Sequence, residues 1–407
     1  MSAETLVAPR TDARSSLRRD VSVSAIVAGL VAVVVSYSGP FVVVLAAARA
    51  AGLSAGHTTS WVWAISLGSG LSCFVLSWWT RTPVITAWST PGAALLLTSL
   101  GGYRYSDAIG AFLIAAIGMT VVGLSGLFGR LITLVPSTII NAMLAGILLP
   151  FVLGAYAQVP NATAIALTML VVFTVGKRLL PRYAVLATLL AGVGVASAQG
   201  QLDLGQVRFA LATPELTMPT LSPAALIGIG LPLFIVTMAS QNAPGIGILT
   251  ASGYEPEDRK LLGGTGIVSV VLAPFGCHAI NLAAITAAIC TGSEAHADPR
   301  RRYIAGMSAG VCYVIVGLFG TGLVQLFAAM PKALVAVLAG TALLAALLGG
   351  LVAAVQETAT RDAALVTLAV TASGLTVARI GSAFWGLVAG VATHLILTVG
   401  SRDTRGR

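Results

Sequence analysis

Two short segments break an otherwise almost continuously apolar chain: Pro83-Val-Ile-Thr-Ala-Trp-Ser-Thr-Pro-Gly92 and Pro274-Phe-Gly-Cys-His-Ala-Ile-Asn281. Each pattern predicts a few extended residues followed by the start of a new apolar helix, and the two occupy corresponding places in the two halves of the chain. At membrane depth, broken backbone survives only where protein buries it or where it lines a cavity. Paired breaks of this kind indicate the substrate site of a membrane transporter.

The composition places the whole chain in a membrane. Of 407 residues, 57% are hydrophobic and 9% are charged, and the mean hydropathy is +0.94. A soluble domain of this length needs far more charge, so the sequence predicts a protein with many membrane spans. The first 20 residues hold four arginines and no apolar run, so we expect no cleavable signal peptide.

The net charge of +9 does not indicate a nucleic-acid partner, because the basic residues are scattered singly between apolar runs. Orientation in the membrane explains them better. The four cysteines have no CxxC spacing and lie inside or beside apolar runs. We expect them to be small buried side chains, with no metal site and no cofactor; they are Cys73, Cys277, Cys290 and Cys312.

The apolar runs predict an all-α polytopic membrane protein with 14 transmembrane segments. A cytoplasmic tail, 1–20, precedes a first seven-span repeat, 21–198; an extracytoplasmic connector, 199–221, leads to a second repeat, 222–400, and a tail, 401–407. Spans 3 and 10 are each broken into a short strand and a half-helix. The spans are about 21–48, 58–79, 83–100, 107–127, 134–154, 160–177, 182–198, 222–249, 261–274, 276–291, 302–323, 331–353, 362–378 and 381–400.

The distribution of Lys and Arg supports this count. With both termini in the cytoplasm, 18 of the 23 basic residues fall on the cytoplasmic side and five fall outside. One wrong span would invert every later loop and remove this asymmetry, so the positive-inside rule favours 14 spans. The five outside residues are Arg49, Arg104, Arg208, Lys332 and Arg379.

Because seven is odd, two seven-span repeats must lie in opposite orientations. Both first spans carry a proline midway along, Pro40 and Pro244, and both third spans carry the breaks. The fifth spans also open alike, with Val135-Pro136 and Met330-Pro331. Matched landmarks in the same order indicate an inverted repeat. Chance is the alternative, since Gly and Pro are frequent in membrane helices.

The predicted site consists mainly of backbone. Asp, Glu, Lys and Arg occur only in tails, loops or at span ends, so no cation in the middle of a span is available to bind an anion. A half-helix that starts at mid-membrane presents unpaired N–H groups and about half a positive charge. Two such starts, one from each half, would form a site for a small anion such as a carboxylate.

The residues at the two breaks fit such helix starts. Ser89 and Thr90 are predicted to cap the first half-helix, Gly92 to allow close approach, and Asn281 to cap the second. The alternative is that these residues only satisfy a broken backbone with nothing bound.

Five further side chains complete the predicted substrate site. Gln241 and Asn242 form a polar pair in the eighth span, and Tyr37 lies in the matching part of the first span. Helix–helix hydrogen bonding is the alternative role for the polar pair. Trp88 is placed to stack on a planar substrate, although core packing is the commoner role of a single Trp. His278 is the candidate proton carrier, with a neutral, hydrogen-bonded histidine as the alternative.

Three motifs carry a family resemblance: Thr82-Pro-Val-Ile-Thr-Ala-Trp-Ser-Thr-Pro-Gly92, Gln241-Asn-Ala-Pro-Gly-Ile246 and Gly381-Ser-Ala-Phe-Trp-Gly386. They resemble the benzoate membrane transport family, the benzoate/proton symporters, and the likeness runs over nearly the whole chain. The resemblance implies the inverted-repeat fold of uracil permeases and sulfate-type anion carriers. In that fold a core domain holds spans 1–4 and 8–11, and a gate domain holds spans 5–7 and 12–14.

One departure from this fold family concerns the proton. Uracil permeases carry glutamates in spans 8 and 10, whereas the matching region here has Gln241, Asn242 and Asn281. This fits an anionic substrate, which a carboxylate would repel, and it leaves the proton carrier unidentified.

The predicted function is import of benzoate or a similar small aromatic carboxylate across the inner membrane by proton symport and alternating access. The expected partners are this substrate, protons and the lipid bilayer, with a homodimer left open and no nucleic acid. An uncoupled or exchange-type carrier of another organic anion is the alternative. A channel is disfavoured by a site closed between two half-helices. An integral-membrane enzyme is the distant alternative, since the four histidines are dispersed and the acids lie outside the spans.

Overall fold

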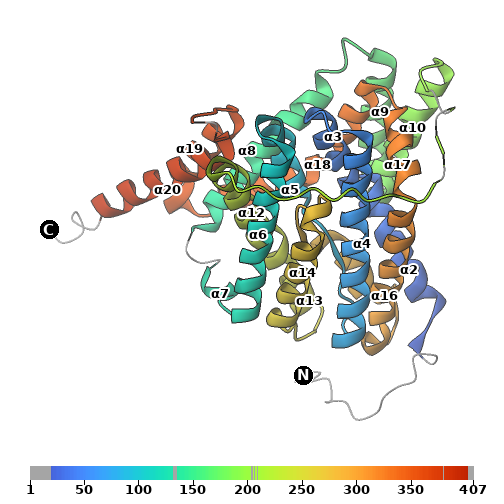
Figure 1. Cartoon of the computed structure of the whole chain (residues 1–407), viewed down its shortest axis with the longest axis horizontal. Coiled ribbons are helices and arrows are strands. Elements are labelled where there is room, and N and C mark those ends of the chain that lie inside the picture. The colour runs from blue at the N-terminus through green and yellow to red at the C-terminus, as the bar shows by residue number, and fades with distance from the viewer. Residues whose placement is uncertain are drawn as a thin grey trace.

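The protein is almost wholly helical, with two three-residue strands near its centre (Figure 1). The structure, a computed structural model, describes residues 20–131, 135–202, 205, 207–208, 210–378 and 380–401. The two predicted cytoplasmic tails, 1–20 and 401–407, therefore lie outside the described residues apart from Asp20 and Ser401, and so does Arg379.

The first half of the chain contains nine helices and one strand among its described residues. They are α2 (Val23–Ser38), α3 (Pro40–Ala50), α4 (Ala55–Thr80), β1 (Thr86–Trp88), α5 (Thr90–Ser99), α6 (Tyr105–Ser125), the short α7 (Phe128–Leu131), α8 (Ser137–Tyr156), α9 (Thr163–Leu179) and α10 (Ala184–Ala198).

The second half follows a similar order. It contains α11 (Pro223–Ala225), η4 (Leu226–Gly230), α12 (Leu231–Thr237), η5 (Met238–Asn242), α13 (Ala243–Ala251), α14 (Asp258–Leu272), β2 (Ile280–Leu282), α15 (Ala284–Thr291), α16 (Tyr303–Leu318), α17 (Gly320–Ala328), α18 (Lys332–Ala354), α19 (Arg361–Ala372) and α20 (Ser382–Ser401). The segments η4 and η5 are π-helical turns.

Proline explains why several predicted spans are not single regular helices. Pro40 has no N–H to donate, and the chain turns at Gly39 between α2 and α3. In the second half, Pro232 and Pro244 each follow a π-turn; at η5, the N–H of Ala243 reaches the carbonyl of Met238. Sequence patterning found the prolines but not the two π-turns.

Six stretches of helix are long and apolar enough to cross a membrane among the described residues, and a seventh results if the pair Pro299–Leu318 and Gly320–Ala328, bent by 65°, is one span. Helix length alone therefore identifies fewer crossings than the 14 predicted. The other apolar helices are shorter, as in α5 and α15, which follow the strands. The six are Val23–Ala50, Ala55–Thr80, Tyr105–Ser125, Ser137–Tyr156, Pro223–Ala251 and Lys332–Ala354.

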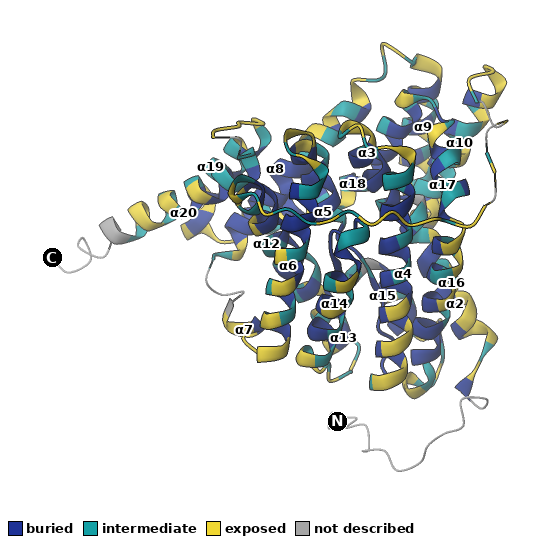
Figure 2. Cartoon of the chain, viewed as in Figure 1, coloured by how far each residue is buried: buried dark blue, intermediate teal, exposed yellow. Residues whose placement is uncertain are grey.

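The helices pack in pairs that join the two halves of the chain. Helix α4 lies along α16, α14 lies along α6, and α8 lies along α18. Buried residues gather on the faces that meet inside the molecule, and exposed residues lie on the outward faces (Figure 2). The outward faces are nonetheless apolar, as a stripe on α4 shows, and such a surface suits contact with lipid; the stripe is Leu71, Phe74, Val75 and Trp78.

The connector between the halves runs across the middle of the molecule in the view of Figure 1, in front of the helices. Its backbone N–H groups bond two carbonyls at or just beyond helix ends: Ala212 bonds Leu318, the last residue of α16, at 2.8 Å, and Thr217 bonds Pro274, two residues beyond α14, at 2.8 Å. The side chain of Ser60 on α4 also bonds the backbone of Glu215. The connector therefore lies against the protein along this length.

The crossing of α4 and α16 depends on two glycines, which gives a first prediction. A Cβ at Gly310 would lie 2.7 Å from the carbonyl oxygen of Gly70, so Gly310→Ala must push the two backbones apart. We expect it to lower the free energy of unfolding by about 1–3 kcal/mol. The matched control is Gly247→Ala in α13, which has open space and should be neutral or stabilising. Thermal unfolding in detergent measures both, and an unchanged midpoint for Gly310→Ala would contradict the close crossing.

Candidate functional site

The two predicted breaks meet as a small antiparallel ribbon. Thr86 pairs with Leu282, Ala87 with Asn281, and Trp88 with Ile280. Two further bonds extend the pairing: Ser89 N–H to the carbonyl of Ala279 at 3.1 Å, and Ala283 N–H to the carbonyl of Ile85 at 2.9 Å. Because the strands are antiparallel, α5 and α15 begin at opposite ends of the ribbon, which three residues make about 10 Å long.

Of the two residues predicted to cap α5, Ser89 does so and Thr90 does not. Ser89 is the N-cap residue, and its hydroxyl accepts a hydrogen bond from the N–H of Gly92 at 3.1 Å. Thr237 on α12 donates to the same hydroxyl at 3.0 Å, so a residue from the second half orients the cap. Thr90 is the first residue of the helix and is half-buried.

The start of α15 is different, and here the predicted role of Asn281 is wrong. The N-cap residue is Ala283, which offers no side-chain acceptor. Asn281 lies two residues earlier, inside β2, and its Nδ2 donates to the carbonyl of Leu282 at 2.8 Å. The first turn of α15 therefore keeps its N–H groups free of any side-chain cap, and this leaves it the more electropositive of the two helix starts.

His278 is fully buried and uses both ring nitrogens. The indole N–H of Trp61 donates to Nδ1 at 3.0 Å, and Nε2 lies 3.0 Å from the carbonyl oxygen of Ser89. An indole N–H can only donate and a carbonyl can only accept, so the ring is neutral with its proton on Nε2. In this position His278 connects α4 to the residue that caps α5.

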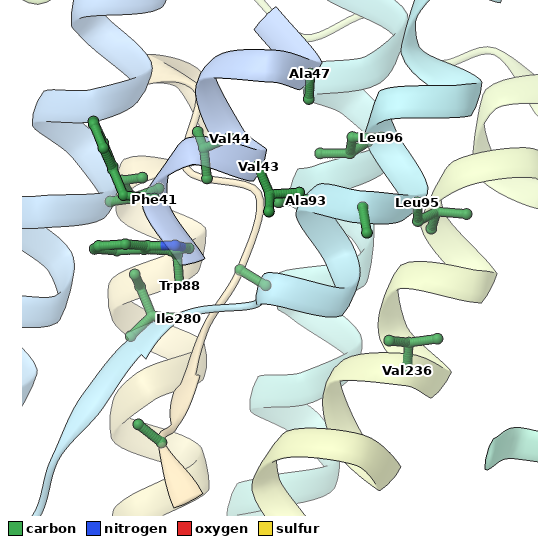
Figure 3. Packing of buried hydrophobic residues seen from close by; sticks show 14 of the residues in the cluster. Phe41, Val43, Val44, Ala47, Trp88, Ala93, Leu95, Leu96, Val236 and Ile280 are labelled. Carbon is green, nitrogen blue, oxygen red and sulfur yellow. The ribbon is translucent and has the colours of Figure 1, made fainter. Parts of the chain in front are cut away.

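Trp88 and Tyr37 belong to a buried aromatic cluster. The ring of Trp88 lies 5.2 Å from that of Tyr37, 5.8 Å from Phe41 and 6.0 Å from Tyr313, centroid to centroid. Figure 3 shows Trp88 between Phe41 and Ile280, beside the start of α5. The hydroxyl of Tyr37 donates to Ser66 at 2.5 Å, whereas Nε1 of Trp88 is buried without a partner. The cluster thus contains one unpaired donor.

The polar pair of the eighth span divides into two roles. Asn242 is buried, and its Oδ1 accepts the N–H of Leu282 at 2.9 Å, so it holds the end of β2. Gln241, the neighbouring residue in η5, is half-buried. Gly92 allows a close approach, but of protein: a Cβ there would lie 2.5 Å from Leu233 of α12.

Two more buried polar atoms near the ribbon have no partner. They are Oδ1 of Asn281 and Oγ of Ser240, which precedes Gln241 in η5. An unpaired buried polar atom costs free energy, so such atoms mark places where a ligand or water is expected. Among the described residues, no group of three or more His, Cys, Asp or Glu side chains is placed to hold a metal ion.

Sequence reasoning missed the side chains that fix the ribbon to the helices around it. Ser72 on α4 bonds the hydroxyl of Thr86 at 2.6 Å, and Ser269 on α14 accepts the N–H of Ile280 at 2.8 Å. A signal was present on α4, where Ser66, Ser69 and Ser72 recur every three residues and so lie near one face.

Comparisons with known proteins identify the family of the chain. Residues 19–396 match the family described as "Benzoate membrane transport protein". The chain is 42% identical over 374 residues to the inner membrane protein YdcO of Escherichia coli (strain K12), covering 92% of this chain and 96% of that protein. It is 38% identical over 382 residues to the benzoate membrane transport protein of Acinetobacter baylyi (strain ATCC 33305 / BD413 / ADP1), covering 94% and 97%.

Solved structures show the fold. The transmembrane domain of the cyanobacterial bicarbonate transporter BicA superposes with a TM-score of 0.59, covering 90% of this chain and 97% of that one at 18% identity. The chain therefore has the fold of this transmembrane domain. The extent of the family match and of both sequence relationships shows that the chain belongs to the benzoate membrane transport protein family.

Proposed function

We propose that this protein imports benzoate or a similar small aromatic carboxylate across the inner membrane, by proton symport and alternating access. The observation that carries the proposal is the ribbon, whose two ends each begin a helix in buried surroundings. The uncapped first turn of α15 supplies N–H donors and positive potential for a carboxylate. We propose that the half-buried Gln241 and Thr90 also belong to the substrate site, with Thr90 at the start of α5 and so at the other end of the ribbon.

The proposal includes 14 spans in two inverted repeats. In each half a long helix, a strand, a short helix and a further long helix follow in the same order. The packing is reciprocal: α4 of the first half lies on α16 of the second, and α14 of the second lies on α6 of the first. Exchange of equivalent partners is what a two-fold axis relating the repeats requires.

The same proposal divides the chain into a core domain and a gate domain. The core would hold α2–α6 with α11–α17, and the gate would hold α8–α10 with α18–α20. Helices α8, α18, α19, α9 and α10 pack mainly on one another, which supports treating them as one body. Alternating access would then move the core, with the ribbon inside it, against the gate.

Proton symport requires a group that carries the proton. The two hydrogen bonds of His278 argue against its role as carrier, because a proton on Nδ1 would displace the Trp61 N–H. The unpaired Oδ1 of Asn281 is an acceptor, and it suits a donor such as the O–H of a carboxylic acid. We propose that the substrate carries the proton itself.

A second candidate is an anion carrier without proton coupling. The acids lie only in tails, loops or at span ends of the sequence, so the spans offer no carboxylate at mid-depth that could exchange protons with the substrate. Accumulation of benzoate in proteoliposomes that collapses with a protonophore would favour symport; accumulation that persists would favour this alternative.

The topology gives a testable consequence. Arg208 lies in the connector, and its backbone N–H donates a hydrogen bond to the side chain of Gln325. A cysteine at this position should react with an impermeant thiol reagent added from outside intact cells. Reaction only after the cytoplasmic face is opened would contradict the proposed 14 spans.

The proposed substrate site gives a second testable prediction. Thr90→Val removes a hydroxyl at the start of α5, and Gln241→Ala removes an amide in η5. Hydrogen bonds to a charged group contribute about 1.5–3 kcal/mol, so each change should weaken benzoate binding by roughly tenfold or more. Thr98→Val on the same helix is the matched control, because Thr98 is exposed and bonds only its own helix at Leu95. Titration calorimetry measures binding, and equal affinity in all three variants would remove the helix starts from the site.

The hydrogen bonds of His278 give a third testable prediction. If its role is to orient the cap of α5, His278→Gln should lower stability and the amount of folded protein. The proton-driven accumulation per folded molecule should still respond to the pH gradient. Uptake in proteoliposomes with a matched protein content, with and without that gradient, measures this. Normal binding with complete loss of the response would instead make His278 the proton carrier.

A further inference from the structure

A cavity of about 400 Å³ lies where the last turns of α3, α5 and α8 meet the first turns of α18. We call it the outer vestibule, because Arg49 and Lys332, which line it, belong to the basic residues assigned to the outside. Its volume falls within the range of small-molecule sites. Under the proposed division it lies on the seam between core and gate.

Two positive charges line the vestibule without a carboxylate to neutralise them. The guanidinium of Arg49 is held by two neutral acceptors, the carbonyls of Phe327 at 2.8 Å and Ala328 at 3.1 Å. Neither Arg49 nor Lys332 forms an ion pair with an acid among the described residues. Their field is therefore available to an anion in the cavity.

Lys332 occupies a position that helix stability disfavours. It is the first residue of α18, where the helix already presents its positive end, and it is exposed. A cation in the first turn is unfavourable for the helix. Lys332 instead places a positive charge on the wall of the cavity, at the N-terminus of α18, which has no side-chain cap.

The remaining walls are mostly apolar. Leu97, Phe151 and Val335 line the cavity, and Gln158 adds a polar amide. Cations beside an apolar wall match a molecule with a carboxylate at one end and a ring at the other. They match a small hydrated anion such as bicarbonate poorly, because an apolar wall offers it no hydrogen bonds.

The vestibule is also close to the ribbon. Leu97 follows Thr90 by seven residues on α5, and Arg49 follows Phe41 by eight on α3. Each spacing is about two helical turns, or roughly 10 Å. An anion held by Arg49 and Lys332 would need to travel only this far along α3 and α5 to reach the start of α5.

We propose that the outer vestibule is a capture site for aromatic carboxylates. Arg49 and Lys332 attract and hold the carboxylate, and Leu97 and Phe151 contact the ring, before the substrate moves to the ribbon. The role as an antechamber rests on the proposed function, whereas the preference for anions rests only on the cavity and its charges.

A reporter cysteine tests the preference without any need for transport. Ala336 lines the cavity, and Ala336→Cys is made together with Cys312→Ser, since Cys312 is the one native cysteine that is not buried. An anionic methanethiosulfonate reagent should modify it about tenfold faster than a cationic one at low ionic strength. Arg49→Gln with Lys332→Gln should bring the ratio close to one, and high salt should do the same.

Several controls make the result decisive. Arg208→Gln removes an outer positive charge that does not line the cavity and should leave the ratio unchanged. Arg49→Lys keeps the charge if Arg49→Gln proves unstable. Benzoate should slow the modification at concentrations where acetate and bicarbonate do not. Equal rates for the two reagents, or no effect of Arg49→Gln and Lys332→Gln, would overturn the anion site, and equal protection by all three anions would overturn its aromatic preference.

Uptake by the native chain separates this inference from the proposed function. If benzoate is transported, Lys332→Gln should raise KM several-fold at low salt and leave the maximal rate unchanged. An unchanged KM would exclude the antechamber role. If the native chain transports no benzoate but the reporter still prefers anions, the proposed substrate fails and the anion-selective vestibule stands.

Discussion

Pairing of β1 with β2 is the interaction on which the rest of the centre depends. Both strands are buried, and backbone N–H and C=O groups in such surroundings must find partners within the protein. Each strand is too short to form a sheet of its own. The backbone N–H and C=O groups of the strand in one half of the chain therefore pair with those of the strand in the other half. The two halves are therefore joined at the point where both would otherwise carry unpaired backbone.

The helices around the ribbon supply what the strands cannot supply to each other. Ser269 accepts the N–H of Ile280, Asn242 accepts that of Leu282, and Ser72 bonds the side chain of Thr86. Most of these side chains come from residue types that apolar helices use sparingly. The free-energy cost of burying these polar side chains is offset, because each of them forms a hydrogen bond with a backbone or hydroxyl group that water cannot reach. The ribbon is held rigidly, and the helix starts at its ends are fixed with it.

The sequence predicts some of this centre well and some of it poorly, for physical reasons. The two breaks and the Ser89 cap follow from local chemistry, because Pro, Gly and a capping hydroxyl act over three or four residues. Local chemistry does not predict the N-cap residue of α15. The position of this residue depends on where β2 ends, and the pairing of β2 with β1 decides where β2 ends. The partners of His278 are also invisible locally, because Trp61 lies 217 residues away. The π-turns before Pro232 and Pro244 need the geometry of the whole eighth span.

The connector has a mechanical consequence. From Arg208 onward it is fastened to α17, α16 and α4, whereas α10 ends at Ala198. Only residues 199–207 lie between these points, and nine residues extend to about 30 Å at most. Under the proposed division into core and gate, this length would limit how far one body can move against the other. Shortening the connector would then restrict that movement without changing any residue of the proposed substrate site.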